Sequence, residues 1–129
     1  MPAKTRANLR QLLSDLVAMP TFTIEHGTCQ AAIDWVRHQV RGLPLHVAEY
    51  HVPVGNGGGR NPVLVLTTRD TKRPKLMLHA HLDVAPAPAS ELKLTARDGR
   101  YYGRGVFDMK YAAATFLHLL LELGDDLTR

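Results

Sequence analysis

The chain has 129 residues, of which 45% are hydrophobic and 22% charged, and these values are typical of one globular domain. A single cysteine, Cys29, excludes an internal disulfide framework and fits a reducing compartment; we expect it to pack as a small core residue. The formal net charge of +4 comes from 16 basic and 12 acidic residues, and the basic ones are scattered in ones and twos. This distribution argues against a nucleic acid as a partner.

The amino-terminal residues do not have the apolar segment of a secretory signal. No apolar run approaches the roughly 20 residues that a membrane-spanning helix needs. From these two observations we expect a soluble, cytoplasmic protein with no membrane partner.

Two amphipathic helices are expected before any strand. Leucine and valine at helical spacing predict the first helix over residues 5–18, and Pro20 ends it. The second is predicted over residues 28–41, with Thr28 as its cap and Gly42 after its end. Its apolar stripe consists of Ala32, Ile33, Val36 and Val40.

Three strands are predicted next, over residues 45–52, 62–68 and 75–80. The glycine-rich segment 55–60 is interpreted as a strand connection, because it lacks the Gly-Lys-Ser/Thr ending and the following helix of a phosphate-binding loop. The connection between the second and third strands is too short for a parallel crossover, so we expect those two strands to be antiparallel.

A hairpin and a third helix complete the predicted elements. The hairpin covers residues 92–102 and turns at Asp98-Gly99. The helix is predicted over residues 109–123 and ends before Gly124. Its apolar face carries Ala113, Phe116, Leu117, Leu120 and Leu121.

The first candidate for chemistry is the sequence His79-Ala-His81-Leu-Asp83, which follows the third predicted strand. Residues at such strand ends face the open edge of an α/β sheet, where ligands commonly bind. The His81 imidazole can bind a metal ion while the Asp83 carboxylate accepts a hydrogen bond from its other nitrogen. Taken alone, the pattern is a weak signal that favours a purely structural role.

The second candidate is Tyr102-Gly-Arg-Gly-Val-Phe-Asp108-Met-Lys110, at the start of the last helix. Its two glycines allow a tight turn that delivers Asp108 to the helix start, where an aspartate is also an ordinary N-cap. Both candidates therefore occupy the boundary of an element. The two together are more informative than either one.

The two motifs resemble a known family. Leu78-His-Ala-His-Leu-Asp-Val-Ala-Pro86, followed by Asp98-Gly and by Gly103-Arg-Gly-Val-Phe-Asp-Met-Lys110, is similar to the zinc exopeptidase family. That family includes acetylornithine deacetylase, succinyl-diaminopimelate desuccinylase, aminoacylase and carboxypeptidase G. The opening helix with Leu16-Val-Ala-Met-Pro20 is also similar, so the resemblance extends over essentially the whole chain. Ala80, Ala85 and Tyr111 depart from the family pattern.

The resemblance implies an α/β fold, namely a three-layer αβα catalytic domain with a mixed sheet. It implies a site for two Zn²⁺ ions, with Co²⁺ or Mn²⁺ as substitutes, and hydrolysis of a peptide or N-acyl amide by a metal-bridging hydroxide. In this reading His81 is a terminal zinc ligand, Asp83 is the catalytic-site carboxylate that orients His81, and Asp108 bridges the two metals. The Asp108-Met109 peptide is a candidate for a strained, cis bond.

The family's Glu-Glu pair, which includes the general base, and its remaining ligands have no counterpart in residues 1–129. We therefore expect these residues to be the amino-terminal part of the catalytic domain of a longer enzyme, without its lid domain. The isolated chain is then expected to be inactive. The expected substrate is a small peptide or N-acyl amino acid, and the resemblance is compatible with a homodimeric parent.

Two alternatives stay open. One is a non-catalytic binding or interaction domain that keeps the family's shape. The other is a different metal hydrolase built around His79 and His81, although Val84 stands where one such motif has a further histidine. We interpret His79 as a strand residue near the site.

Overall fold

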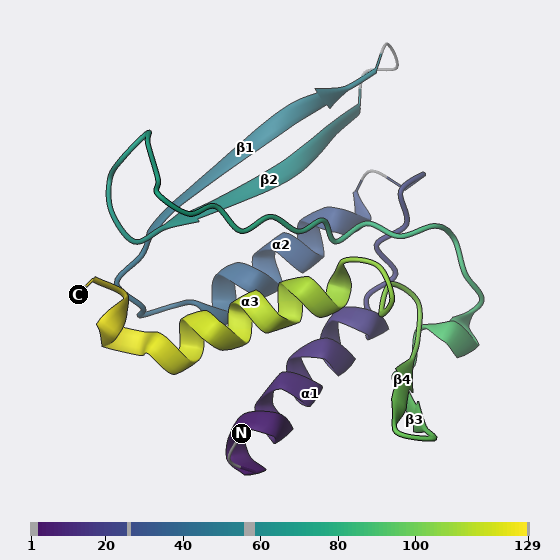
Figure 1. Cartoon of the computed structure of the whole chain (residues 1–129). Helices are drawn as coiled ribbons and strands as arrows, with labels where there is room; N and C mark the ends of the chain where they lie inside the picture. The colour runs from purple at the N-terminus through teal and green to yellow at the C-terminus, as the bar shows by residue number, and fades with distance from the viewer. Residues whose placement is uncertain (1–2, 26, 56–58, 129) are drawn as a thin grey trace.

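The structure is a computed structural model, and it describes residues 3–25, 27–55 and 59–128. Three helices lie on one side of a long β-hairpin, and a second, short hairpin projects near the end of the first helix (Figure 1). The α/β class expected from the sequence is confirmed. None of the described helices combines the length and apolar character that crossing a bilayer requires.

The helices are α1 (Ala3–Ala18), α2 (Thr28–Gln39) and α3 (Lys110–Leu123). All three match the predicted helices, and Gly124 ends α3 as expected. The predicted cap of α2 is wrong, because Gly27 occupies the N-cap position and Thr28 is the first helical residue. The Thr28 hydroxyl instead donates to the carbonyl of Glu25 at 2.8 Å, which ties the helix start to the preceding turn.

The long hairpin consists of β1 (His46–Val54) and β2 (Gly59–Thr67), paired antiparallel. Tyr50 lies opposite Val63, and Glu49 lies opposite Leu64. Successive side chains alternate between the two faces of a strand. The face carrying Leu64 and Leu66 packs against the helices, whereas the face carrying Tyr50, Val63 and Val65 is exposed.

Part of the glycine-rich connection between these strands, residues 56–58, lies outside the described residues. Gly55, the last described residue before this gap, has a φ of +53°. Residues that carry a side chain rarely adopt this backbone conformation.

The predicted third strand over residues 75–80 is wrong. This segment has no regular secondary structure and is paired with no described strand, and Leu76 and Met77 are 75% and 78% exposed. An apolar, extended run becomes a strand only when a neighbouring strand supplies hydrogen-bond partners. The described part of the chain offers no such neighbour.

The short hairpin is confirmed, with β3 (Thr95–Arg97) and β4 (Arg100–Tyr102) shorter than predicted. Its turn contains Asp98 and Gly99, both with positive φ, as expected for an Asp-Gly turn. Two short 3₁₀ helices flank the later elements, η1 (Ala89–Glu91) and η2 (Gly124–Thr128).

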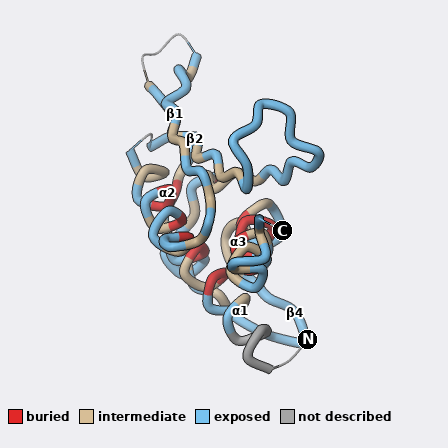
Figure 2. Tube along the Cα trace, turned by 90° about the vertical axis from the view of Figure 1, so that its left-hand side faces the viewer, coloured by how far each residue is buried: buried red, intermediate tan, exposed pale blue. Residues whose placement is uncertain are grey.

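The core lies between the helices, where buried residues of α1, α2 and α3 face one another (Figure 2). Leu16 and Val17 of α1 and Ala114 of α3 are completely buried. The predicted apolar stripe of α2 is buried as expected. Cys29, expected in the core, is only partly buried, and that expectation is wrong.

Candidate functional site

The segment after α1 lies beside the segment that carries the first motif. Phe22 and Val84 form a parallel β-bridge. The Val84 amide donates to the Thr21 carbonyl at 2.8 Å, and the Thr23 amide donates to the Val84 carbonyl at 3.0 Å. The buried Thr21 hydroxyl adds a 2.5 Å hydrogen bond to the Leu82 carbonyl. These bonds fix the backbone on which His81 and Asp83 are placed.

His81 and Asp83 contact each other as the sequence predicts. The imidazole Nδ1 of His81 lies 3.2 Å from Asp83 Oδ1 and 3.0 Å from the Asp83 carbonyl oxygen. Both neighbours accept hydrogen bonds, so we assign the proton to Nδ1. The lone pair of Nε2 is then available to a metal ion.

The glycines of the second motif make the turn that brings Asp108 to His81. Gly105 has a φ of +83°, and a Cβ at this position would lie 2.8 Å from Lys110 Cδ and 2.9 Å from Val84 Cγ1. The Gly105 carbonyl accepts hydrogen bonds from the amides of Asp108 and Lys110. Only glycine combines this backbone conformation with such close neighbours.

Asp108 Oδ1 lies 3.3 Å from His81 Nε2, so the two motifs meet at one place. Asp108 is not the N-cap of α3, because Met109 occupies that position. The expectation of a cis Asp108-Met109 bond is wrong, since no cis peptide occurs among the described residues. The chain reaches α3 through the positive φ angles of Gly103 and Gly105 instead.

The donor set fits a zinc ion. Imidazole nitrogen and carboxylate oxygen are ligands that zinc prefers, at about 2.0 Å each. Two ligands of a tetrahedral ion at that bond length are about 3.3 Å apart, which is also the separation of His81 Nε2 and Asp108 Oδ1. A lone pair facing a carboxylate oxygen at this distance is repulsive without a cation or proton between them. The pair is therefore suited to a cation.

Other possible ligands are not gathered here. Among the residues that the structure describes, no group of three or more His, Cys, Asp or Glu side chains could hold a metal ion. His79 is exposed and makes no hydrogen bond or ion pair with the described residues. The structure brings together His81, Asp83 and Asp108 and leaves His79 apart from them.

Lys110 lies two residues beyond Asp108 and is buried, with 1% of its surface exposed. Its ammonium group donates to the carbonyls of Leu16 and Met19 at 2.8 Å each, at the carboxyl end of α1. Burial lowers the pKa of Lys110 to about 8. The cation joins the end of α1 to the start of α3 and suits the negative end of the α1 dipole.

Sequence reasoning assigned no role to Lys110. A signal was present, because Lys110 falls on the same helical stripe as the buried Ala113, Ala114 and Leu117. A lysine on an apolar stripe indicates a buried amine that needs hydrogen-bond acceptors.

The charges of this site affect the pKa of Cys29, near the start of α2. Burial raises the pKa of the Cys29 thiol, and the Asp83 carboxylate raises it further. The Thr28 hydroxyl and the Lys110 ammonium act in the opposite direction.

An open pocket of about 540 Å³ adjoins Asp108. Its walls include Val84, Glu91, Arg104 and the exposed ring of Phe107. Glu91 holds Arg104 through two contacts. Its carboxylate accepts from the Arg104 guanidinium at 2.8 Å, and its backbone carbonyl accepts from the Arg104 amide at 2.7 Å. The pocket therefore places an apolar surface and a fixed arginine beside the candidate metal ligand.

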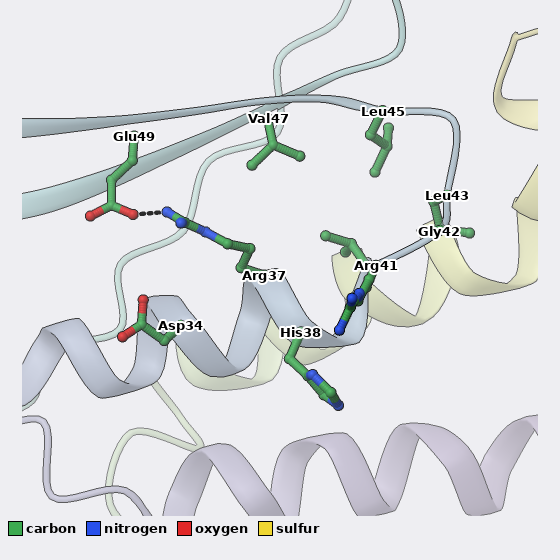
Figure 3. Close-up of a pocket in the computed structure, with 10 residues that line it drawn as sticks. Asp34, Arg37, His38, Arg41, Gly42, Leu43, Leu45, Val47 and Glu49 are labelled. Carbon is green, nitrogen blue, oxygen red and sulfur yellow. Dashed lines mark ion pairs between the residues drawn. The ribbon is translucent and has the colours of Figure 1, made fainter.

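A second open pocket, of about 700 Å³, lies between α2 and β1 and contains none of the motif residues. Its lining combines Arg37, His38 and Arg41 with apolar side chains from the connection between α2 and β1 and from the start of β1 (Figure 3). Arg37 points across the pocket and forms an ion pair with Glu49 (Figure 3). This contact fixes the hairpin against α2.

Comparison with known proteins gives matches over both motifs. The family model described as peptidase family M20/M25/M40 matches residues 77–129. Succinyl-diaminopimelate desuccinylase of Gluconacetobacter diazotrophicus is 33% identical over 121 residues, which cover 90% of this chain and 29% of that protein. Cysteinylglycine-S-conjugate dipeptidase of Corynebacterium striatum is 35% identical over 118 residues, covering 81% of this chain and 24% of that protein.

A solved structure has the same fold. The di-peptidase Dug1p of Saccharomyces cerevisiae matches 93% of this chain and 29% of its own, with a TM-score of 0.72 and 14% sequence identity. The chain thus spans less than a third of the length of these relatives. The family match and the named relatives confirm the resemblance that the two motifs indicate, and they relate this chain to the M20 peptidases.

Proposed function

We propose that this chain is the amino-terminal part of the catalytic domain of a dinuclear zinc peptidase or amidohydrolase. The observation that carries the proposal is the 3.3 Å approach of His81 Nε2 to Asp108 Oδ1, with Asp83 behind the imidazole. Two motifs that are far apart in the sequence meet in a geometry that suits shared metal ligands. The relationship to the M20 peptidases supports the same reading.

Each of the three residues has a separate role in this proposal. His81 is a terminal ligand of one zinc ion through Nε2. The Asp83 carboxylate accepts a hydrogen bond from the protonated Nδ1 of His81. This bond keeps the imidazole in the tautomer and orientation that a metal needs. Asp108 would hold both ions, because a carboxylate has two oxygens that can each bind one metal. When bound, zinc would acidify water near neutral pH and polarise the carbonyl of the scissile bond; Co²⁺ or Mn²⁺ would be substitutes.

The remaining parts of the proposal concern the whole protein. The exposed outer face of the β1–β2 hairpin supports a larger, three-layer αβα domain, and so does segment 75–80, which pairs with none of the described strands. A further segment of such a protein would supply the general base and the missing ligands, and a lid domain would complete the pocket. We propose a cytoplasmic enzyme with no nucleic-acid or membrane partner, and the family resemblance is compatible with a homodimer.

The proposed substrates are small peptides or N-acyl amino acids. The names of the two curated relatives specify a succinyl-diaminopimelate substrate and a cysteinylglycine S-conjugate. Both contain an amide bond next to a carboxylate. The pocket beside Asp108, with Phe107 and Arg104 in its wall, has room for one residue of such a substrate.

The test uses the complete reading frame that encodes this chain. The purified product, loaded with Zn²⁺ or Co²⁺, is assayed on N-succinyl-diaminopimelate and on cysteinylglycine conjugates. His81→Ala and Asp108→Ala are expected to lower kcat/KM at least 10³-fold, because each removes a ligand. The exposed His79→Ala variant is the matched control and should retain activity.

Each other outcome has a distinct meaning. Full activity of His81→Ala or Asp108→Ala contradicts the assignment of the ligands. Loss of activity in His79→Ala favours a hydrolase built on the His79 and His81 pair. A reading frame that ends at residue 129, with a product that neither binds zinc nor hydrolyses amides, favours a non-catalytic domain.

A further inference from the structure

Thr23 is outside both motifs, yet it is hydrogen-bonded to the site. Its hydroxyl donates to Asp83 Oδ2 at 2.9 Å and lies 3.1 Å from the Val84 carbonyl oxygen. The other oxygen of the same carboxylate, Oδ1, faces His81 Nδ1 at 3.2 Å. Each oxygen of Asp83 thus has its own donor.

Backbone contacts hold Thr23 in position in addition to its hydroxyl. Its backbone amide donates to the Val84 carbonyl, and the β-bridge between Phe22 and Val84 holds the segment against residues 82–84. The buried Thr21 hydroxyl fixes the same segment through its hydrogen bond to the Leu82 carbonyl. A donor on a fixed backbone is suited to orienting a side chain that is itself 37% exposed.

We propose that Thr23 is a positioning residue that sets the rotamer of Asp83 and, through Asp83, the orientation of the His81 imidazole. Rotation of the carboxylate about χ1 or χ2 would break the hydroxyl contact or the imidazole contact. With both contacts in place, one oxygen is committed to Thr23 and the other to the Nδ1 proton. The proposal rests on the proposed function for its catalytic consequence but not for its structural content.

The experiment compares Thr23→Val with Thr23→Ser in the full 129-residue chain. Valine has nearly the shape of threonine and keeps the backbone hydrogen bond, but it removes the hydroxyl; serine keeps the hydroxyl. Three-bond scalar couplings from Asp83 Cγ to its backbone nitrogen and carbonyl carbon report the χ1 populations in solution, without zinc. Thr95→Val, an exposed substitution on β3, is the matched control.

We expect one dominant Asp83 rotamer in the wild type, in Thr23→Ser and in Thr95→Val. In Thr23→Val the ratio of that rotamer to the others should fall about fivefold, as the loss of one hydrogen bond would produce. Urea unfolding checks that the variants are folded. An unchanged Asp83 rotamer in folded Thr23→Val overturns the proposal, and so does averaging in Thr23→Ser equal to that in Thr23→Val.

A second readout separates this proposal from the proposed function. In the zinc-loaded product of the complete reading frame, Thr23→Val should lower kcat several-fold and Thr23→Ser should restore it. A rotamer change with no zinc-dependent hydrolysis in any variant supports the role of Thr23 and contradicts the enzyme. Zinc-dependent hydrolysis with an unchanged Asp83 rotamer in Thr23→Val supports the enzyme and contradicts the role of Thr23.

Discussion

Two side chains, of Lys110 and Thr23, connect the end of α1 and the segment after it to the two halves of the site. Lys110 joins the Leu16 and Met19 carbonyls to the segment that carries Asp108. Thr23, four residues after Met19, contacts Asp83 in the other half. The described part of the segment between α1 and α2 therefore supports both motifs.

Lys110→Met tests this support at one side chain. Methionine fills a similar volume, but it leaves the Leu16 and Met19 carbonyls without their buried donor. We expect the free energy of unfolding in urea to fall by about 1–3 kcal/mol. The exposed Lys75→Met variant should change it by less than about 0.5 kcal/mol. Equal stabilities of the two variants would contradict the role of the buried ammonium.

Cys29 provides a chemical probe next to Asp83. A raised thiol pKa means less thiolate at pH 8, and the thiolate is the form that iodoacetamide alkylates. We expect alkylation of the folded chain to be slower than that of the chain unfolded in urea, and to accelerate as the pH rises above 9. Asp83→Asn should increase the rate in the folded state, because the carboxylate raises the pKa. Asp34→Asn, an exposed change on the same helix, should not.

At the scale of elements, the turn before α3 depends on Gly105. Gly105→Ala would place a methyl group within 2.9 Å of Lys110 and Val84 at a φ of +83°. Gly99→Ala meets a similar φ, +72°, with no atom within 4 Å, so it isolates the backbone strain. We expect Gly105→Ala to be the more destabilising by at least about 1 kcal/mol in urea unfolding. The reverse order would mean that the contacts under Gly105 are not tight.

The two faces of the β1–β2 hairpin should respond differently to the same kind of change. Leu66→Thr removes apolar contact with the helical core and should cost about 1–2 kcal/mol of unfolding free energy. Val65→Thr, one residue away on the exposed face, should cost less than about 0.5 kcal/mol. Thermal unfolding monitored by circular dichroism measures both. Similar losses at the two positions would contradict the assigned faces.

At the scale of the whole molecule, the site is assembled from three distant segments but offers few ligands. His81 and Asp108 together cannot close a coordination shell of four around one zinc ion, still less around two. We expect the 129-residue chain to bind Zn²⁺ weakly and below a 1:1 ratio in isothermal titration calorimetry, and to hydrolyse no amide substrate. Tight binding of two zinc ions would contradict the proposed roles.

Much of this molecule could be predicted from local patterns. Helical spacing located α1, α2 and α3, and an Asp-Gly turn located the short hairpin, because these elements form their hydrogen bonds within or beside themselves. The two motifs led to the prediction that His81, Asp83 and Asp108 share one site, and the structure places the three side chains in contact. The sequence therefore determined the α/β class and the relationship to the M20 peptidases, and it supplied the three candidate site residues that the structure brings into contact.

Tertiary structure decided the remainder. Residues 75–80 have the composition of a strand but pair with no strand in the described part of the chain, because a strand requires a partner that only the fold can supply. Lys110 and Thr23 act on residues that are 91 and 60 positions away, a distance over which no sequence pattern carries information. The 3.3 Å approach of His81 to Asp108 likewise exists only because the bridge at Val84 and the turn at Gly105 bring two chain segments to one place.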